Sequence, residues 1–172
     1  MTIPSFSHDV EVLLQSYVED LAATPATVLA EISNFNWLWP IFESKCCNGN
    51  ACKASIEQFC SNYAKRYSAD DFDTELGYFR ERYRSENAEA TSHLDKLLSH
   101  RGQGLKDSIL VGLCEQAEPD SKMKALVLIV YRLRNNLFHG TKGGLGFTDQ
   151  LDNFVHANRV LIEIIKKTCE PC

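Results

Sequence analysis

The chain has 172 residues, of which 18 are lysine or arginine and 23 are aspartate or glutamate, giving a formal net charge of −5. Apolar residues make up 44% and charged residues 24%, a composition that excludes collagen-like and low-complexity chains and argues against disorder. The negative net charge argues against a partner made of phosphates, unless the positive charges gather in one part of the chain.

No secretion or membrane segment is expected. Residues 1–8 lack the basic and apolar regions of a signal peptide. The longest apolar run, residues 125–131, is far shorter than the ~20 residues that span a bilayer. We therefore expect a cytoplasmic protein without a membrane partner.

Apolar residues at helical spacing predict an all-α bundle, and strand patterns are nearly absent. The first predicted helix covers residues 8–22 after an N-cap at Ser7, and its apolar stripe consists of Val10, Leu13, Leu14, Tyr17, Val18 and Leu21. A second helix covers residues 26–46 and is broken or kinked near Pro40. A third follows the turn at residues 48–50, and its apolar positions include Ile56, Phe59, Cys60 and Tyr63.

Further helical segments are predicted from Ser68 onward. They cover residues 68–83, 88–98, 105–116, 122–139 and about 148–167. The segment ending at residue 139 is apolar on almost every side over residues 125–131, which predicts a central, buried helix. The glycine-rich residues 140–146 end that helix and connect it to the last one.

The seven cysteines do not indicate a disulfide framework, because their number is odd and no secretion signal is present. They are Cys46, Cys47, Cys52, Cys60, Cys114, Cys169 and Cys172. A zinc site could join the first three to the terminal Cys169-x-x-Cys172 pair. Only the terminal pair has good ligand spacing, so we expect reduced thiols without a metal or other cofactor. Zinc remains the alternative.

The residues that can carry chemistry lie where the buried helix ends. The sequence changes there from apolar residues to Arg132, Arg134, Asn135, Asn136 and His139. A positioned imidazole can act as general acid or base toward the 2′-hydroxyl or the leaving oxygen of RNA. A guanidinium can stabilise the phosphate and its transition-state charge, and an asparagine can orient either group. These residue types therefore suit RNA cleavage without a metal.

The string from Arg134 to His139 resembles the R-x4-H motif of HEPN domains, in which the arginine is typically followed by Asn, Asp or His. The wider string, residues 125–140, is similar to bacterial HEPN proteins of the Apea-like kind, and residues 78–83 resemble that group less specifically. The resemblance covers about residues 70–168. We accordingly expect a Cys-containing helical lobe at 1–66, a HEPN-like bundle at 67–168 and a tail at 169–172.

The resemblance implies a four- to five-helix bundle that forms a homodimer through its motif helices. It also implies a metal-independent endoribonuclease of a toxin–antitoxin or anti-phage defence system, with an antitoxin or another defence protein as partner. Carried over to this chain, His139 is the catalytic imidazole, Arg134 the phosphate-binding residue and Asn135 the orienting residue. We expect Arg132, Asn136 and Lys142 to contact the RNA.

The charge distribution fits such a partner. Residues 121–148 contain five basic residues and no acidic one, although the whole chain is acidic. This predicts a small, salt-sensitive RNA footprint. Two alternatives stay open: a non-catalytic HEPN module for RNA binding or dimerisation, and a zinc- or redox-responsive sensor built on the N-terminal cysteines.

Overall fold

The computed structural model describes residues 24–66, 68–99, 102–138 and 149–169. Its regular elements are α2 (Ala26–Cys46), α3 (Lys53–Ala64), α4 (Asp73–Tyr83), α5 (Ser92–Leu97), α6 (Lys106–Gly112), α7 (Pro119–Phe138) and α8 (Leu151–Cys169), with short 3₁₀ helices η2 (Ala69–Phe72) and η3 (Gln103–Leu105). The predicted all-α fold is confirmed, since the only strand-like pairing among these residues is a single bridge between Arg84 and Ala90.

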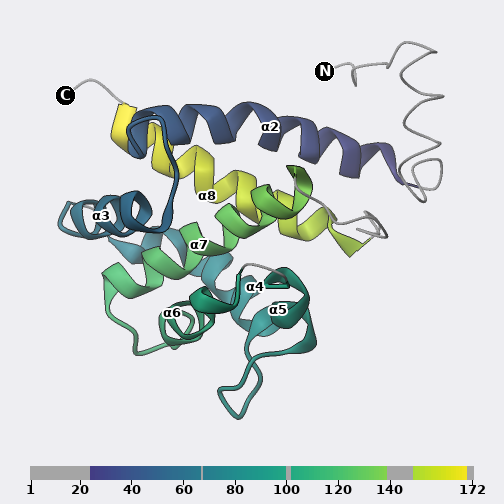
Figure 1. Ribbon diagram of the computed structural model, residues 1–172, viewed down its shortest axis with the longest axis vertical. Coiled ribbons are helices and arrows are strands. Elements are labelled where there is room, and N and C mark those ends of the chain that lie inside the picture. The colour runs from purple at the N-terminus through teal and green to yellow at the C-terminus, as the bar shows by residue number, and fades with distance from the viewer. Residues whose placement is uncertain (1–23, 67, 100–101, 139–148, 170–172) are drawn as a thin grey trace.

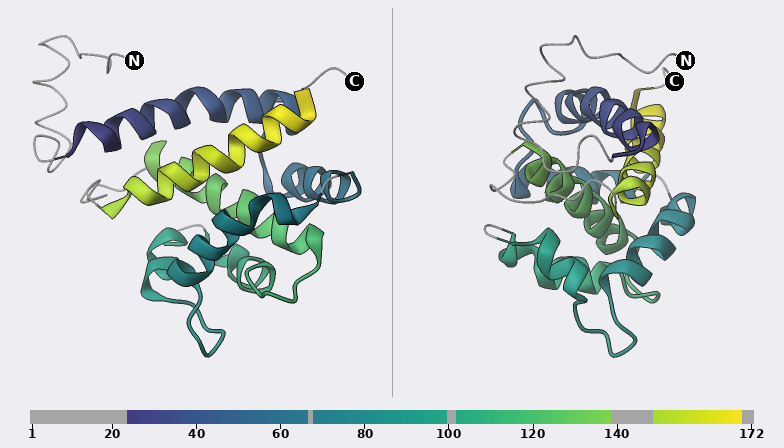
Figure 2. Two further views of the ribbon diagram at one scale, coloured as in Figure 1. Left: turned by 180° about the vertical axis from the view of Figure 1, so that it is seen from behind. Right: turned by 90° about the vertical axis from the view of Figure 1, so that its right-hand side faces the viewer.

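The helices are arranged around α7 (Figure 1). Helices α2 and α8 lie side by side along one side of the molecule and run in the same direction, so that their C-terminal ends meet (Figures 1 and 2). Helices α3, α4, α5 and α6 contact α7 from its other sides. Helix α7 thus contacts α3, α4, α5, α6 and α8, and it also meets Trp39 of α2 through Tyr131.

The interior position of α7 follows from its sequence. Residues 125–130 are each at most 1% exposed, which confirms the predicted central helix. Burial of such an all-round apolar helix contributes about 1.5–3 kcal/mol for each large side chain. The aromatic residues of α2 extend the same core, since Phe35 packs edge-to-face on Phe154 of α8 and Trp39 lies against Tyr131 of α7. The predicted lobe at 1–66 and the predicted bundle thus share one core in their described parts.

Three local predictions need correction. Helix α2 continues through Pro40 without the predicted break, because the proline lies on the exposed side, where water can replace the lost backbone hydrogen bond. Residues 88–91, predicted as the start of a helix, belong to the turn that precedes α5, with Ala88 at a φ of 66°. Helix α7 begins at Pro119, three residues before the predicted start at residue 122, and proline favours this first position of a helix.

Several predicted features fall outside the described residues. They are the helix at 8–22, the connector at 140–146 and the last residues of the tail. Within the part of the chain that the structure covers, no helix combines the length and apolar character needed to cross a membrane.

The packing of α6 on α7 depends on Gly112. A Cβ atom at this position would lie 2.1 Å from the backbone oxygen of Ser121 and 2.6 Å from Cβ of Ala125. We predict that Gly112→Ala lowers the free energy of unfolding by about 1–3 kcal/mol, because the two backbones must separate. Urea denaturation followed by circular dichroism measures the change.

The matched control is Gly77→Ala in α4, where the added Cβ meets nothing within 4 Å. An alanine in that helix should stabilise the protein by up to about 1 kcal/mol through its higher helix propensity. Equal effects of the two substitutions would contradict the close approach of α6 and α7.

Candidate functional site at the end of helix α7

The described part of the motif occupies the last turn of α7, which ends at Phe138. Arg134, Asn135 and Asn136 belong to this turn. His139 and Lys142 lie outside the described residues, so their predicted roles stay predictions.

Arg132 is fixed inside the fold. Its side chain is only 6% exposed, and its guanidinium donates to the backbone oxygen of Leu97 at 3.4 Å and to that of Ser99 at 3.3 Å. Asn136 completes the contact: its Oδ1 accepts from Arg132 Nη2 at 3.0 Å, and its Nδ2 donates to the Leu97 oxygen at 2.9 Å. These carbonyls lie at the C-terminal end of α5, where helix carbonyls lack partners within the helix.

The arginine occupies a site shaped to receive it. Gly102 closes the turn after α5, and a Cβ atom there would lie 2.8 Å from Nε of Arg132. Burial lowers the pKa of the guanidinium from its ordinary value. Arg132 and Asn136 therefore anchor α7 to α5, and their predicted contact with RNA stays a prediction beside this structural role. Their polar character and position at a helix end could not distinguish the two roles in the sequence.

Arg134 and Asn135 lie elsewhere on the helix surface. Arg134 is two residues beyond Arg132, which places it about 200° around the helix axis, on the side away from α5. Its Nη1 donates to the side-chain oxygen of the neighbouring Asn135 at 3.2 Å, and both side chains are half-buried. The structure thus brings together the predicted phosphate-binding and orienting residues.

The start of α8 is also anchored. The hydroxyls of Tyr78 and Tyr83 on α4 both donate to Oδ1 of Asn153, at 3.0 and 3.2 Å. Arg82 Nη2 donates to the backbone oxygen of Asp149 at 3.1 Å. The sequence did not lead us to predict Asn153, although an asparagine on the apolar side of the last helix indicates a buried polar contact.

These contacts frame the segment that carries His139. Helix α7 leads into it and is held on α5, and α8 leaves it and is held on α4. The two ends of the segment at 139–148 are therefore fixed on separate parts of the same bundle. A site that includes this segment would be built on fixed supports at both ends.

A second polar pair links α4 and α8. Glu75 is 7% exposed, and its Oε1 lies 3.6 Å from Nδ1 of His156. The imidazole stacks on the ring of Tyr78, with ring centroids 4.1 Å apart. Burial lowers the pKa of His156, while the Glu75 carboxylate acts in the opposite direction.

Cys47, Cys52, Cys60 and Cys114 are free thiols. Cys46 Sγ lies 3.6 Å from the hydroxyl of Thr168, which brings the C-terminal ends of α2 and α8 together. Burial raises the pKa of Cys47 to about 12, whereas hydrogen bonds from Ser55 lower the pKa of the exposed Cys52. Among the described side chains no group of three or more could hold a metal. The thiol of Cys169 and all of Cys172 lie outside this set, so the zinc alternative stays untested.

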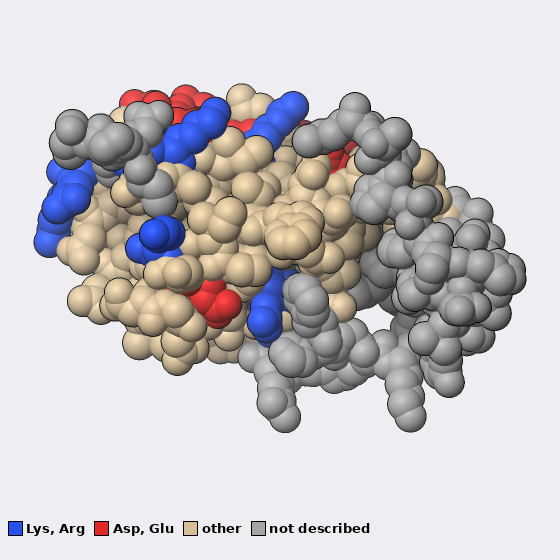
Figure 3. Space-filling model, turned by 90° about the horizontal axis from the view of Figure 1, so that it is seen from above, with Lys and Arg blue, Asp and Glu red and all other residues tan. Residues whose placement is uncertain are grey.

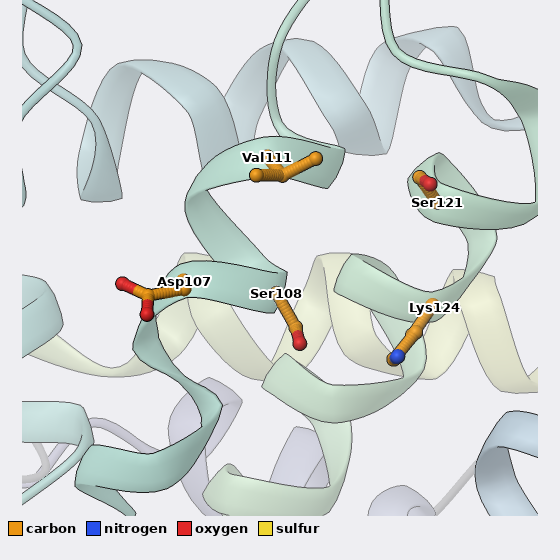
Figure 4. A pocket seen from close by; sticks show the side chains of 5 residues that line it. All are labelled: Asp107, Ser108, Val111, Ser121 and Lys124. Atoms are coloured by element: carbon orange, nitrogen blue, oxygen red, sulfur yellow. The ribbon is translucent and has the colours of Figure 1, made fainter.

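An open depression lies at the other end of α7 (Figure 4). It lies between α6 and the first turns of α7 and is lined by Asp107, Ser108, Val111, Ser121 and Lys124. The ammonium of Lys124 pairs with Glu57 at 2.6 Å. Because Lys124 precedes Arg134 by ten residues, about 15 Å along the helix, this depression is separate from the motif.

Comparison with known proteins identified no similar protein. No protein-family model matches the chain, and no curated protein and no solved structure matches it either. The fold and the site define an all-α helical bundle with a polar, arginine-containing helix end.

The anchoring role of Arg132 gives a first prediction for this site. Arg132→Ala should lower the free energy of unfolding by about 2–4 kcal/mol, because the Ser99 carbonyl and Asn136 Oδ1 lose their donor, the Leu97 carbonyl keeps only that of Asn136, and the buried arginine stem leaves a cavity. Arg159→Ala, an exposed arginine on α8, should change it by less than about 0.5 kcal/mol. Denaturant unfolding of both variants makes the comparison, and equal losses would contradict the anchor.

The lowered pKa of His156 predicts a pH dependence of stability. The folded protein takes up this proton less readily than the unfolded chain, whose histidine titrates near 6.5. The corresponding stability is present above that pH and is lost as the pH falls through it. We expect His156→Gln to remove part of the decline in unfolding free energy between about pH 7.5 and 5.5.

His93, an exposed residue of α5, supplies the control. His93→Gln should leave the slope of stability against pH unchanged. A His156→Gln variant with the wild-type slope would show that another group causes the decline.

Proposed function

We propose that the chain is a HEPN-type, metal-independent endoribonuclease in which Arg134 and His139 carry the reaction and Asn135 orients them. The observation that carries the proposal is the position of the Arg134–Asn135 pair. It lies in the last turn of a buried helix, on the side that the α5 anchor leaves open.

The local charge supports an anionic ligand. Residues 121–148 contain no acid, and four of their five basic residues belong to α7. Arg132 uses its charge inside the fold, and Lys124 pairs with Glu57. Arg134 is the described cation of this helix end that does not belong to the α5 anchor. One cation suits contact with a single phosphate better than contact with a long stretch of nucleic acid.

Each residue then has a chemical role. Arg134 would bind the scissile phosphate and stabilise the charge that develops in the transition state. His139 would move a proton, either from the 2′-hydroxyl or to the leaving oxygen. Asn135, which accepts a hydrogen bond from Arg134, would hold the guanidinium in place. Attack by the 2′-hydroxyl would restrict the reaction to RNA.

A homodimer completes the proposed site. Arg134 and His139 are five residues apart, about 140° around an ideal helix, so one helix does not align them closely. A second copy beside the first would pair Arg134 of one chain with His139 of the other. The RNA substrate, this self-association and a role in defence or toxin–antitoxin pairing all belong to the proposal.

Incubation with a mixed RNA pool in EDTA tests the activity. Wild type should produce fragments ending in a 2′,3′-cyclic phosphate. His139→Ala and Arg134→Ala should each cleave about 10²–10⁴-fold more slowly, because each loses a group that acts in the transition state. Fragment sequencing and end-group analysis measure both the rate and the chemistry.

Exposed residues of the same type provide controls. His93→Ala and Arg159→Ala should cleave at the wild-type rate, since both side chains lie on other helices. Cleavage by His139→Ala at that rate would overturn the mechanism. RNA retention without any cleaved product would instead favour the non-catalytic module.

A further inference from the structure

The outer face of α2 carries an exposed apolar patch, formed by Trp37, Pro40 and Ile41, beside the exposed Asn34 and Asn36. Trp37 is 76% exposed and Ile41, one turn further, is 43% exposed. No charged residue occurs between Glu31 and Glu43. The view onto this side of the molecule accordingly shows a broad uncharged surface with charges near its edges (Figure 3). A tryptophan this exposed on a soluble bundle indicates a surface that takes a partner.

The two carboxylates that border this face, those of Glu31 and Glu43, accept hydrogen bonds from other parts of the protein. Glu31 accepts from the side-chain nitrogen of Asn158 on α8 at 2.7 Å. Glu43 accepts from the backbone N–H of Ala51 at 3.0 Å. A partner that packs on Trp37 and Ile41 therefore meets one charge at the edge of the face, the exposed Lys45 one turn beyond Ile41, and its own contact surface should be largely apolar.

The chain itself contains a segment with that surface. The sequence of residues 8–22 predicts a helix whose apolar residues form one stripe, while its acidic residues lie off the stripe. Residue 22 is four positions before Ala26, where α2 begins. A chain that reverses at Thr24–Pro25 would bring this segment back along α2 as a helical hairpin.

The lengths agree. A helix over residues 8–22 is about 22 Å long, and the distance along α2 from Ala26 to Ile41 is also about 22 Å. In a hairpin Val10, about 18 Å from residue 22, would therefore lie between the levels of Trp37 and Ile41, and Leu14 would lie about one turn before Trp37. The later part, ending at Leu21, would lie over the first turns of α2.

A second copy of the chain fits the face less well. Two Trp37 side chains packed together would bury on the order of 400 Å². The smallest specific interfaces bury about 1,200 Å². A tethered segment needs a smaller surface, because its attachment removes most of the entropy cost of association.

We propose that the outer face of α2 is the docking site of residues 8–22, with Trp37 and Ile41 received between the apolar side chains of the segment. This surface lies on α2, whereas the proposed catalytic residues lie on α7 and after it. The docking proposal and the proposed ribonuclease function can therefore fail separately.

Acrylamide quenching of tryptophan fluorescence in the full chain tests the docking. The contribution of Trp37 is the difference between wild type and Trp37→Phe, because Trp39 is buried. We expect Trp37 to be shielded in wild type and at least about twofold more accessible to the quencher in Leu14→Asp. Gln15→Asp adds the same charge one residue further, off the apolar stripe, and should leave Trp37 shielded.

Hydrogen exchange provides the reciprocal measurement. Trp37→Asp should raise the exchange rate of the amides in residues 8–22, whereas Val111→Asp, at an exposed apolar position on α6, should not. This measurement tests the docking even if the Leu14→Asp variant folds poorly. A fully accessible Trp37 in wild type would overturn the proposal. Shielding that disappears on dilution would overturn it too, because the occupant would then be a second copy.

Discussion

A buried guanidinium without a carboxylate partner among the described residues sets the geometry of the motif. Arg132 is held by the carbonyls of Leu97 and Ser99 and by the Asn136 amide, so its charge is satisfied by dipoles at the end of α5. Such a group tolerates little displacement, because each lost hydrogen bond leaves a buried polar atom unpaired. The last turns of α7 are thereby fixed in rotation as well as position, and the rotation decides which residues face α5 and which do not.

The rest of the bundle supports this arrangement. The apolar middle of α7 is surrounded by five helices, and α8 is held at its first turn by two tyrosine hydroxyls from α4. Close packing at Gly112 brings α6 against the beginning of α7. The motif therefore begins in the last turn of a helix that is held by packing and hydrogen bonds along its whole described length. For the proposed ribonuclease this means that Arg134 and Asn135, the described groups that would meet a phosphate, are preorganised by the helix that carries them.

The helical fold could be predicted from local sequence, but the polar contacts between distant helices could not. The helical periodicity and the all-round apolar run at 125–131 were sufficient for the all-α fold and the central helix. The role of Arg132 was not predictable, since its partners lie more than thirty residues earlier and only the folded chain brings them together. Asn153 and the Glu75–His156 pair were missed for the same reason. The continuity of α2 through Pro40 depends on which side of the helix the proline occupies, and local propensity does not contain that information.

The anchor at the end of α5 also has an evolutionary consequence. Gly102 has no room for a side chain only because Nε of Arg132 and the backbone of Leu98 fill the adjacent space. A change at Arg132 to a smaller residue would leave Asn136 without its partner, whereas the Leu98 backbone, 2.8 Å from a Cβ at Gly102, would still exclude a side chain there. Arg132 and Asn136 are therefore expected to change together in evolution, and Gly102 is expected to stay a glycine whatever residue stands at position 132. Arg134, two residues from Arg132 in the sequence, is not part of this pair, so selection at that position can follow whatever ligand the protein binds.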